Sequence, residues 1–304
     1  MNNRQRFRAH LADPKMLMVP IAHDPLCARI IERAGFQAVG VGGAASAAAL
    51  LGRPDARLLS AREMADVVWR TVDAVGVPVF ADADDGYGDA THVAWTVRQY
   101  ESAGAAGLFL ADRPARRQRG RTVGGAVGGA VGETEDDTVV PAAELIGRIE
   151  AAVAARRDPD LLIMARTDAL AAHGIDEALG RAHGCVDAGA DAICVAHPAS
   201  THQMRRITEE ITARRGIPTM ADASPGVMPP PTAAELQQMG YALTLYPTLA
   251  SRALARAVAD VMGELSWSGD AAPLADRLAP FEEFHALARP PEHREAVSPP
   301  GARR

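Results

Sequence analysis

Lysine is almost absent from this sequence of 304 residues. Lys15 is the only one, and every other cation among the 32 lysine and arginine side chains is an arginine. An enzyme that works through a Schiff base needs a lysine amine in its pocket. Because Lys15 precedes the first apolar run, lysine-imine aldolase and pyridoxal phosphate chemistry are disfavoured. The motif GK[ST] is also missing, which excludes a Walker-type phosphate loop.

Cysteine is sparse as well: the chain has three, Cys27, Cys185 and Cys194, and no CxxC pair. This argues against a disulfide framework or a thiolate metal site, and a core role is expected for all three. The beginning of the sequence has no apolar signal segment, and no run of about 18 apolar residues occurs. We therefore expect a cytoplasmic protein that neither enters a membrane nor binds nucleic acid, since basic residues cluster only at 113–121.

What the chain does contain is a regular alternation of short apolar runs and longer helix-like segments. Eight strands, each followed by a helix, predict an α/β fold, a (β/α)8 TIM barrel with a closed parallel sheet. An open doubly wound sheet is the alternative, less favoured because no GxGxxG follows the first strand. The expected strands are 17–22, 38–43, 77–84, 107–112, 161–169, 192–197, 218–223 and 242–247.

Two segments interrupt this alternation. The span 113–140 is too long for an ordinary connection and contains the glycine tract GGAVGGAVG. The second is the C-terminal extension, 266–304, which we expect to be helical at 275–288 and disordered beyond it. The predicted organisation is one barrel domain, 1–265, followed by this extension.

Polar residues follow most of the predicted strands. In a parallel barrel the active site lies at the carboxyl ends of the strands, so these residues should meet at one rim. Strand alternation would place Asp82 and Asp84 on one face with Ala83 opposite. A hard divalent ion bound by two such carboxylates would offset their mutual repulsion. The other rim residues are Gly42, Gly43, Asp112, Arg166, Asp168, His197, Asp222 and Tyr246.

Each of these residues also has a simpler interpretation. Aspartates at strand ends often cap the next helix, and Asp85 is expected to be a turn or cap residue. Asp168 either acts directly or only holds Arg166 by a salt bridge. A histidine such as His197 is often merely hydrogen-bonded.

Three stretches resemble one known family, the isocitrate lyase and phosphoenolpyruvate mutase superfamily. They are VGVGGAASAAALLGRPDARLLSAREM (39–64), VPVFADADDGYGD (77–89) and ARTDA (165–169), within a likeness that spans about 15–260. The resemblance implies a (β/α)8 barrel that binds Mg²⁺ and acts on small 2-oxo or 2-hydroxy acids. It also implies a homodimer or homotetramer whose subunits exchange the eighth helix.

The resemblance assigns roles to particular residues. Asp82 and Asp84 match the metal-binding pair, with Asp84 as the direct ligand of Mg²⁺ or Mn²⁺, and Asp55 matches an aspartate near the metal. Arg166 matches the arginine that contacts the anionic carboxylic acid substrate. The backbone amides of the turn formed by Gly42, Gly43 and Ala44 are expected to hold its carboxylate.

The departures from the family leave the reaction open. Ala111 and Asp112 stand where the family has Glu-Asp, so either Asp112 replaces the glutamate at the metal or the metal site is weaker. The loop carries RRQRGR (116–121) instead of the KKCGH or KRCGH of the lyases, and it lacks the lysine and asparagine of the phosphonomutases. Its arginines would clamp an anionic substrate with the glycine tract as hinge, or they form a solvated loop.

A Mg²⁺-dependent lyase fits the retained residues best. It would cleave a C–C bond of a small 2-oxo or 2-hydroxy acid, by aldol-type cleavage or decarboxylation, through a metal-stabilised enolate. Catalytic roles are expected for Arg166, Asp55 and His197, the last as the base of an aldol-type cleavage. The alternatives are phosphonomutase-type P–C chemistry, or a barrel that has lost the reaction and serves as a binding or assembly protein.

Overall fold

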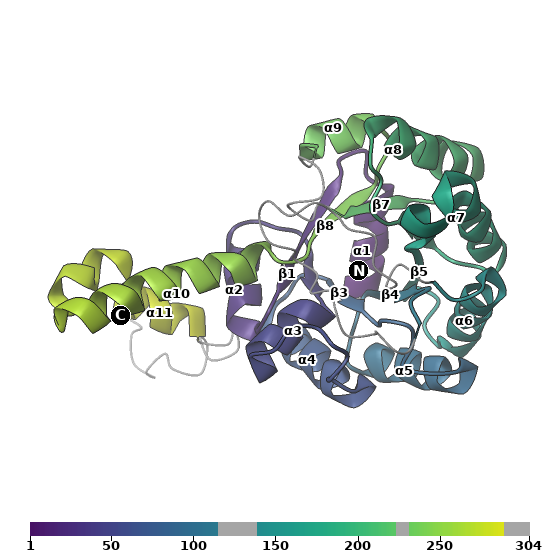
Figure 1. Cartoon of the computed structure of the whole chain (residues 1–304). Coiled ribbons are helices and arrows are strands. Elements are labelled where there is room, and N and C mark those ends of the chain that lie inside the picture. The colour runs from purple at the N-terminus through teal and green to yellow at the C-terminus, as the bar shows by residue number, and fades with distance from the viewer. Residues whose placement is uncertain (115–138, 223–230, 289–304) are drawn as a thin grey trace, which may run out of the picture.

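The computed structural model describes residues 1–114, 139–222 and 231–288. Within them eight parallel strands form a closed barrel in chain order (Figure 1). The pairing of β1 with β8, from Leu17 with Leu243 to Pro20 with Tyr246, closes the ring. The predicted barrel is thus confirmed and the open doubly wound sheet is wrong. The strands are β1 (Leu17–Ala22), β2 (Val39–Val41), β3 (Val79–Asp82), β4 (Gly107–Ala111), β5 (Leu162–Thr167), β6 (Ala192–Val195), β7 (Thr219–Asp222) and β8 (Leu243–Tyr246).

Helices surround the barrel, and their starts follow capping rules that can be read from the sequence. Ser60 and Thr232 each begin a helix with a capping box, in which the glutamate three residues later bonds back to the cap amide. The helices are α1 (Asn3–Ala12), α2 (Pro25–Arg33), α3 (Gly43–Leu51), α4 (Ala61–Ala74), α5 (Ala90–Ser102), α6 (Ala142–Ala155), α7 (Ala169–Asp187), α8 (Thr201–Thr208) with its π-helical continuation η1 (Glu209–Ala213), α9 (Ala233–Gln238), α10 (Leu249–Ser268), the 3₁₀ turn η2 (Ala272–Arg277) and α11 (Phe281–Ala288). None of the helices in the described ranges is long and apolar enough to cross a membrane.

The barrel interior is filled by side chains and closed at its amino end by α1. Phe7 of α1 is fully buried and stacks on Phe80 of β3, with ring centroids 5.4 Å apart. Phe80 in turn lies 5.9 Å from the ring of Phe109 on β4. Arg4 and Arg8 tie α1 down by donating to the carbonyls of Ala105 and Asp160, which precede β4 and β5. The carboxyl ends of the strands are therefore the end at which a site can form.

A second apolar cluster lies between the strands and the helices, and the predicted core cysteines contribute to it. Cys27 on α2 and Cys185 on α7 are buried there, whereas Cys194 on β6 is buried inside the barrel. The predicted core role of the three cysteines is confirmed.

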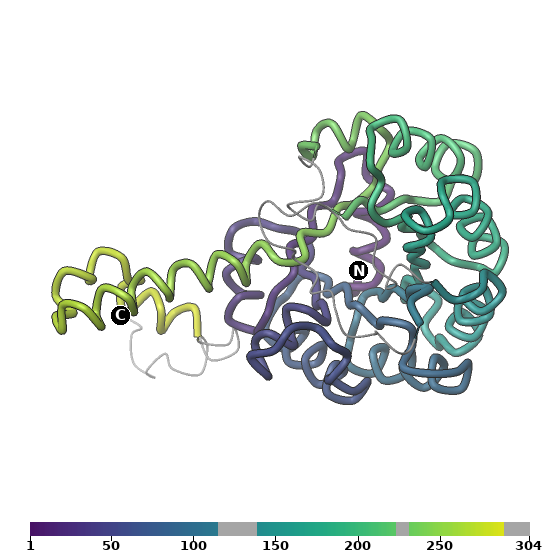
Figure 2. The backbone as a smooth tube through the Cα atoms, in the orientation of Figure 1, coloured from purple at the N-terminus to yellow at the C-terminus, as the bar shows by residue number. Residues whose placement is uncertain are grey.

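The C-terminal helices leave the barrel. Helix α10 projects outward as an arm, and η2 and α11 fold back along it (Figures 1 and 2). The helix predicted at 275–288 is present only in part, because Leu278–Pro280 separate η2 from α11. The disorder predicted beyond this point falls outside the described residues, as do most of the long span after β4 and its arginines Arg116, Arg117, Arg119 and Arg121.

Phe80 offers a test of the interior packing. Replacing it with alanine removes a fully buried ring that contacts rings on both sides, so Phe80→Ala should lower the free energy of unfolding by roughly 3–5 kcal/mol in urea titrations. Trp95→Ala is the matched control, because Trp95 on α5 is 61% exposed and its loss should change little. Equal effects of the two substitutions would contradict the stacked interior.

Candidate active site

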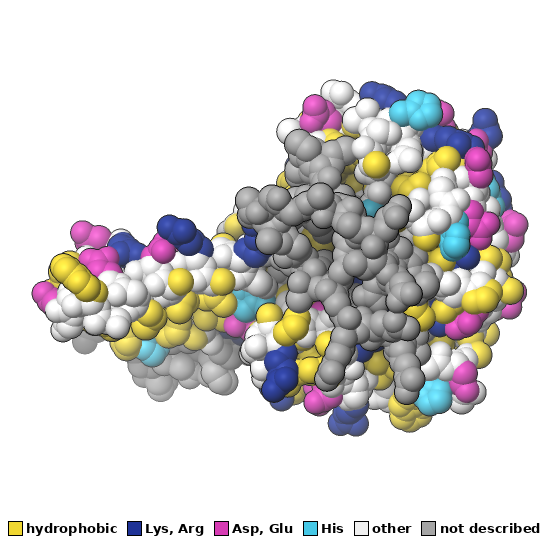
Figure 3. All heavy atoms as spheres, viewed as in Figure 1, with side chains coloured by type: hydrophobic (Ala, Val, Ile, Leu, Met, Phe, Trp, Pro, Cys, Tyr) yellow, Lys and Arg dark blue, Asp and Glu magenta, His cyan; other side chains and the backbone are white. Residues whose placement is uncertain are grey.

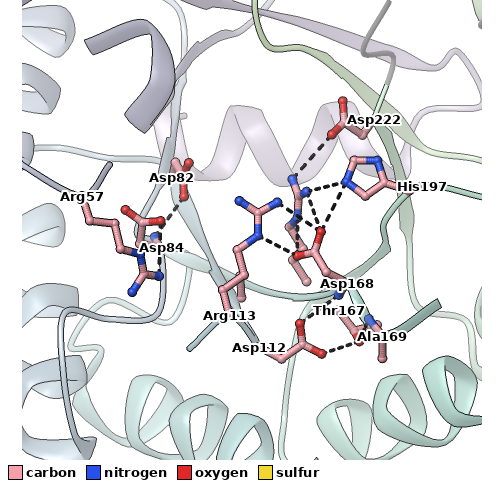
Figure 4. A network of polar contacts seen from close by, with 12 residues as sticks. Arg57, Asp82, Asp84, Asp112, Arg113, Thr167, Asp168, Ala169, His197 and Asp222 are labelled. Carbon is pink, nitrogen blue, oxygen red and sulfur yellow. Dashed lines mark hydrogen bonds and ion pairs between the residues drawn. The ribbon is translucent and has the colours of Figure 1, made fainter. Parts of the chain in front are cut away.

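Two groups of charged side chains face each other at the carboxyl rim (Figure 4). The acidic group consists of Asp55, Asp82 and Asp84, with Arg57 beside them. The basic group consists of Arg113 and Arg166, held by Asp168 and accompanied by His197 and Asp222. The structure therefore brings together most of the rim residues expected from the sequence, and it adds Arg57 and Arg113.

Asp82 and Asp84 lie side by side, although not for the reason predicted. Strand β3 ends at Asp82, and Asp84 lies in the following turn with a left-handed backbone at φ +50°. The amide of Asp84 donates to Asp82 Oδ1 at 2.9 Å. The alternation argument is thus wrong in detail, because a turn and not the strand pleat brings the two carboxylates together.

The protonation of these two carboxyls reflects their surroundings. Burial raises the pKa of Asp84 to about 7, with a further contribution from the charge of Asp82, while Arg57 opposes the shift. Burial also raises the pKa of Asp82, although the amide of Asp84 and the charge of Arg166 counteract it. Two neighbouring buried carboxyls with raised pKa values lack sufficient positive charge nearby, and a bound cation would supply it.

The start of α3 adds backbone donors to this side of the rim. Gly42 is the N-cap residue of α3 and makes no side-chain cap hydrogen bond. The first amides of the helix, from Gly43 and Ala44, lie at the positive end of the helix dipole. The amide of Gly43 lies 3.4 Å from Asp82 Oδ2. A Cβ atom placed on Gly43 would lie 3.5 Å from Asp55 Oδ2, so Asp55 also borders this turn.

On the opposite side, one carboxylate holds two arginines. Arg166 donates from Nε and Nη2 to the two oxygens of Asp168 at 3.2 and 3.0 Å, and Arg113 does the same at 3.1 Å for both bonds. Burial alone would raise the pKa of Asp168, but Arg113 and Arg166 outweigh it and hold that pKa well below its usual range. The predicted salt bridge between Asp168 and Arg166 is present, and Asp168 also binds a second arginine that the sequence analysis did not single out.

His197 joins this group from the end of β6. Its Nε2 lies 3.4 Å from Asp168 Oδ1 and 3.5 Å from Arg166 Nη2, and its backbone is left-handed at φ +57°. Asp222 at the end of β7 lies 3.5 Å from Arg166 Nη1. The imidazole is thus oriented by a carboxylate at the rim and is one-third exposed.

Asp112 does not belong to the acidic group, which corrects the expectation that it would replace the family glutamate. It is fully buried, and both of its oxygens are used inside the protein (Figure 4). Oδ1 accepts from the amide of Asp168 at 2.8 Å, and Oδ2 accepts from Thr167 Oγ1 at 2.5 Å and Arg181 at 3.3 Å. Its carboxylate braces the turn that carries Asp168.

The donor set can be compared with the requirements of Mg²⁺. The described residues contain no group of three or more His, Cys, Asp or Glu side chains that could hold an ion, so four aspartates do not converge as one coordination shell. Mg²⁺ keeps several of its waters and is usually bound by only one or two carboxylates. Asp84 and Asp82 provide two hard oxygen donors with poorly compensated charge. They fit a hydrated Mg²⁺ or Mn²⁺ ion, with Asp55 close enough to the same turn to bond to its water.

The raised pKa of Asp84 gives a prediction about stability and pH. The folded state binds the Asp84 proton more tightly than the unfolded chain does. The free energy of unfolding of the parent therefore falls as the pH rises from about 4 to about 7. Asp84→Asn removes this decrease. In EDTA, the free energy of unfolding of the variant relative to the parent should therefore rise with pH in this window, by up to roughly 1.4 kcal/mol per unit.

Ser102→Ala, at the exposed end of α5, is the control for this measurement because its side chain carries no charge, and its difference from the parent should not vary with pH in this way. A constant difference for Asp84→Asn across the window would contradict the assignment of a raised pKa to this carboxyl.

The chain is similar to known proteins over most of its length. The family model described as phosphoenolpyruvate phosphomutase matches residues 7–266. The chain is 38% identical to 2,3-dimethylmalate lyase of Eubacterium barkeri over 94% of each protein. A crystal structure of a 2,3-dimethylmalate lyase superposes with a TM-score of 0.84 at 26% identity, covering 97% of this chain and 98% of the other. Phosphonopyruvate hydrolase in complex with oxalate and Mg²⁺ superposes with a TM-score of 0.82 at 28% identity over 98% of both chains. The chain therefore belongs to the PEP mutase/isocitrate lyase superfamily.

Proposed function

We propose that this protein is a Mg²⁺-dependent lyase that cleaves a C–C bond of a small 2-oxo or 2-hydroxy carboxylic acid. The observation that carries the proposal is the pair of opposed groups at one rim, an acidic one suited to a hydrated metal and a basic one suited to a carboxylate. The 2,3-dimethylmalate lyase to which the chain is 38% identical supports the reaction class.

The acidic group would hold the metal. Asp84 would bind it directly, with Asp82 and Asp55 accepting hydrogen bonds from its waters. When bound, Mg²⁺ supplies a Lewis acid that polarises the substrate carbonyl or hydroxyl oxygen. The carboxyls of Asp82 and Asp84 are largely shielded from solvent, which strengthens the electrostatic interactions of the site.

The substrate carboxylate would lie between the start of α3 and the basic group. The amides of Gly43 and Ala44 donate from one side, and the guanidinium of Arg166 donates from the other. Arg113 adds a second guanidinium charge next to the first, which favours a substrate that carries a second anionic group. Asp168 keeps both forks in place while the site is empty of substrate.

His197 would move the proton. In an aldol-type cleavage the substrate hydroxyl must lose a proton, and His197, oriented by the contact of its Nε2 with Asp168, would accept that proton at its other ring nitrogen, Nδ1. In a decarboxylation this base is not required, because water can protonate the product. Arginine is a poor proton donor, so Arg113 and Arg166 bind and orient the substrate.

A phosphonate is the second candidate substrate. Two adjacent guanidinium forks bind a phosphonate as readily as a carboxylate, and one similar solved structure is a phosphonopyruvate hydrolase. The remaining alternative is a barrel that has lost the reaction and serves as a binding or assembly protein. It is favoured by Ala111, which offers no carboxylate to a metal.

The proposal is tested by a substrate panel measured with Mg²⁺ and with EDTA. Oxaloacetate, 2,3-dimethylmalate and 2-methylisocitrate are followed by release of keto acids, and phosphonopyruvate is followed by phosphorus NMR. We expect keto-acid release from one or more of the carboxylic acids with Mg²⁺, its loss in EDTA and its return on readdition of the metal. Turnover that persists in EDTA, or release of phosphate alone, would overturn the proposal.

Arg166→Gln should lower kcat/KM of that reaction roughly 10- to 100-fold, since a charge-assisted hydrogen bond to the substrate is lost. Arg98→Gln, which removes an exposed arginine from α5, should leave it unchanged. Equal rates for the parent and Arg166→Gln would remove this residue from the substrate site.

We also propose that the arm mediates assembly of a homodimer or homotetramer by helix exchange. Helix α10 has no buried residue over its 20 residues and carries an apolar stripe with a spacing of four: Leu254, Val258 and Met262, each about half exposed. Figure 3 shows hydrophobic side chains along the arm. Exposure of such an apolar stripe to water is unfavourable, and the stripe is suited to contact with a second copy of the chain.

Aspartates at Leu254, Val258 and Met262 should therefore shift the mass measured by light scattering after gel filtration toward the monomer. Arg256→Ala on the same helix, where the side chain is 82% exposed, should not change it. The same mass for both variants would argue against assembly through this stripe.

A further inference from the structure

Arg57 is a cation placed inside the acidic group. It lies in the connection between α3 and α4 with a left-handed backbone at φ +55°, a conformation that arginine rarely adopts. Its side chain is only 12% exposed. Such a backbone conformation persists only where the surrounding structure holds it in place.

The contacts of Arg57 are with the carboxylates of the acidic group. Nη1 donates to Asp85 Oδ2 at 2.9 Å, and Nη2 lies 3.6 Å from Asp84 Oδ1 (Figure 4). The Arg57 amide lies 3.4 Å from Asp55 Oδ1. In the described part of the chain, the buried Nε and Nη2 have no hydrogen-bond partner. The attraction of Arg57 to Asp84 is therefore one of charge without a formed hydrogen bond.

Asp85 binds Arg57 from the other side. Asp85 is 2% exposed and also accepts from the amide of Tyr87 at 2.9 Å, so it is fixed as a turn residue, as expected from the sequence. With Arg57 held there, its guanidinium cannot leave the neighbourhood of Asp84 without breaking a buried ion pair. Asp84 thus faces a resident cation that is part of the chain.

The structure assigns to Arg57 the role of an internal cation that competes with the divalent metal for Asp84 and so sets the metal affinity. This rests on the proposed function, in which Asp84 is the direct metal ligand. Because Arg57 and a divalent ion repel each other across one carboxylate, the metal alone binds weakly. An anionic ligand brought to the same rim offsets the repulsion, so metal and ligand bind with positive coupling.

The test measures Mg²⁺ binding directly, by isothermal titration calorimetry on the full chain, with and without saturating oxalate as the anionic probe. Arg57→Gln removes the charge and keeps the length of the side chain. Arg57→Gly removes the charge and relieves the left-handed backbone, so it serves if the glutamine variant fails to fold. Arg57→Lys keeps the charge, and Arg53→Gln removes an exposed charge from the same connection.

We expect Mg²⁺ alone to bind Arg57→Gln and Arg57→Gly on the order of tenfold more tightly than the parent, because a nearby unit charge has been removed. The enhancement of Mg²⁺ binding by oxalate should shrink in these two variants. Arg57→Lys and Arg53→Gln should bind like the parent.

Unchanged or weaker Mg²⁺ binding by both charge-removing variants, with a parent that does bind, would overturn the inference and leave the proposed lyase standing. It would mean that Arg57 only holds Asp84 and Asp85 in position. No Mg²⁺ binding by any of the five proteins, even with oxalate, would overturn the metal site itself and the inference with it.

Discussion

The rim depends on one electrostatic constraint, the burial of two adjacent carboxyls at the end of β3. The backbone amide of Asp84 donates to the carboxylate of Asp82, which keeps the two residues adjacent, and burial makes the charged form of each carboxyl costly. Such a pair is stable only if it holds a proton, a metal or a neighbouring cation. Arg57 supplies part of that charge from the acidic side, and Arg113 reaches toward the pair from the basic side (Figure 4).

In the basic group, two positive charges lie close together and are held by ion pairs with one carboxylate. Two guanidinium groups next to each other repel, and Asp168 separates them by accepting both forks. Asp168 is fixed by its own amide, which donates to Asp112. The chain from Asp112 through Asp168 to the arginines thus transmits the rigidity of the buried core to the substrate side, which is why a fully buried aspartate matters to the site without touching it.

The fold could be predicted because parallel strands buried on both faces are read as continuous apolar runs. The predicted strands were too long mainly at their carboxyl ends, where rim residues such as Asp84, Asp112 and His197 follow the last residue of the observed strand. Which residues lie at the rim was therefore predictable, but the direction of each side chain was not. Asp112 turns away from the acidic group to bind Thr167 and Arg181. These partners lie 55 and 69 residues further along the chain, so no local sequence pattern reveals the contact.

Arg57 and Arg113 were missed for different reasons. Arg113 directly follows a strand-end aspartate, and this position indicates a place at the rim. The sequence analysis instead counted Arg113 as part of the basic cluster at 113–121. Arg57 has no such signal: it lies between two helices, and its left-handed backbone cannot be read from an arginine in the sequence. Contacts that depend on a strained turn and on a distant carboxylate need coordinates.

Ala111 and Arg57 together change the charge around Asp84 in one direction. The family resemblance places a glutamate where Ala111 stands, so one negative charge is absent, and Arg57 adds a positive one. A metal bound there meets less attraction from the protein, and more of the balance must come from the substrate. A ligand with two anionic groups serves this better than one with a single group, because one group can approach the acidic side while the other meets Arg113 and Arg166. In the proposed lyase, the net charge of the ligand would therefore bear on which acid is turned over.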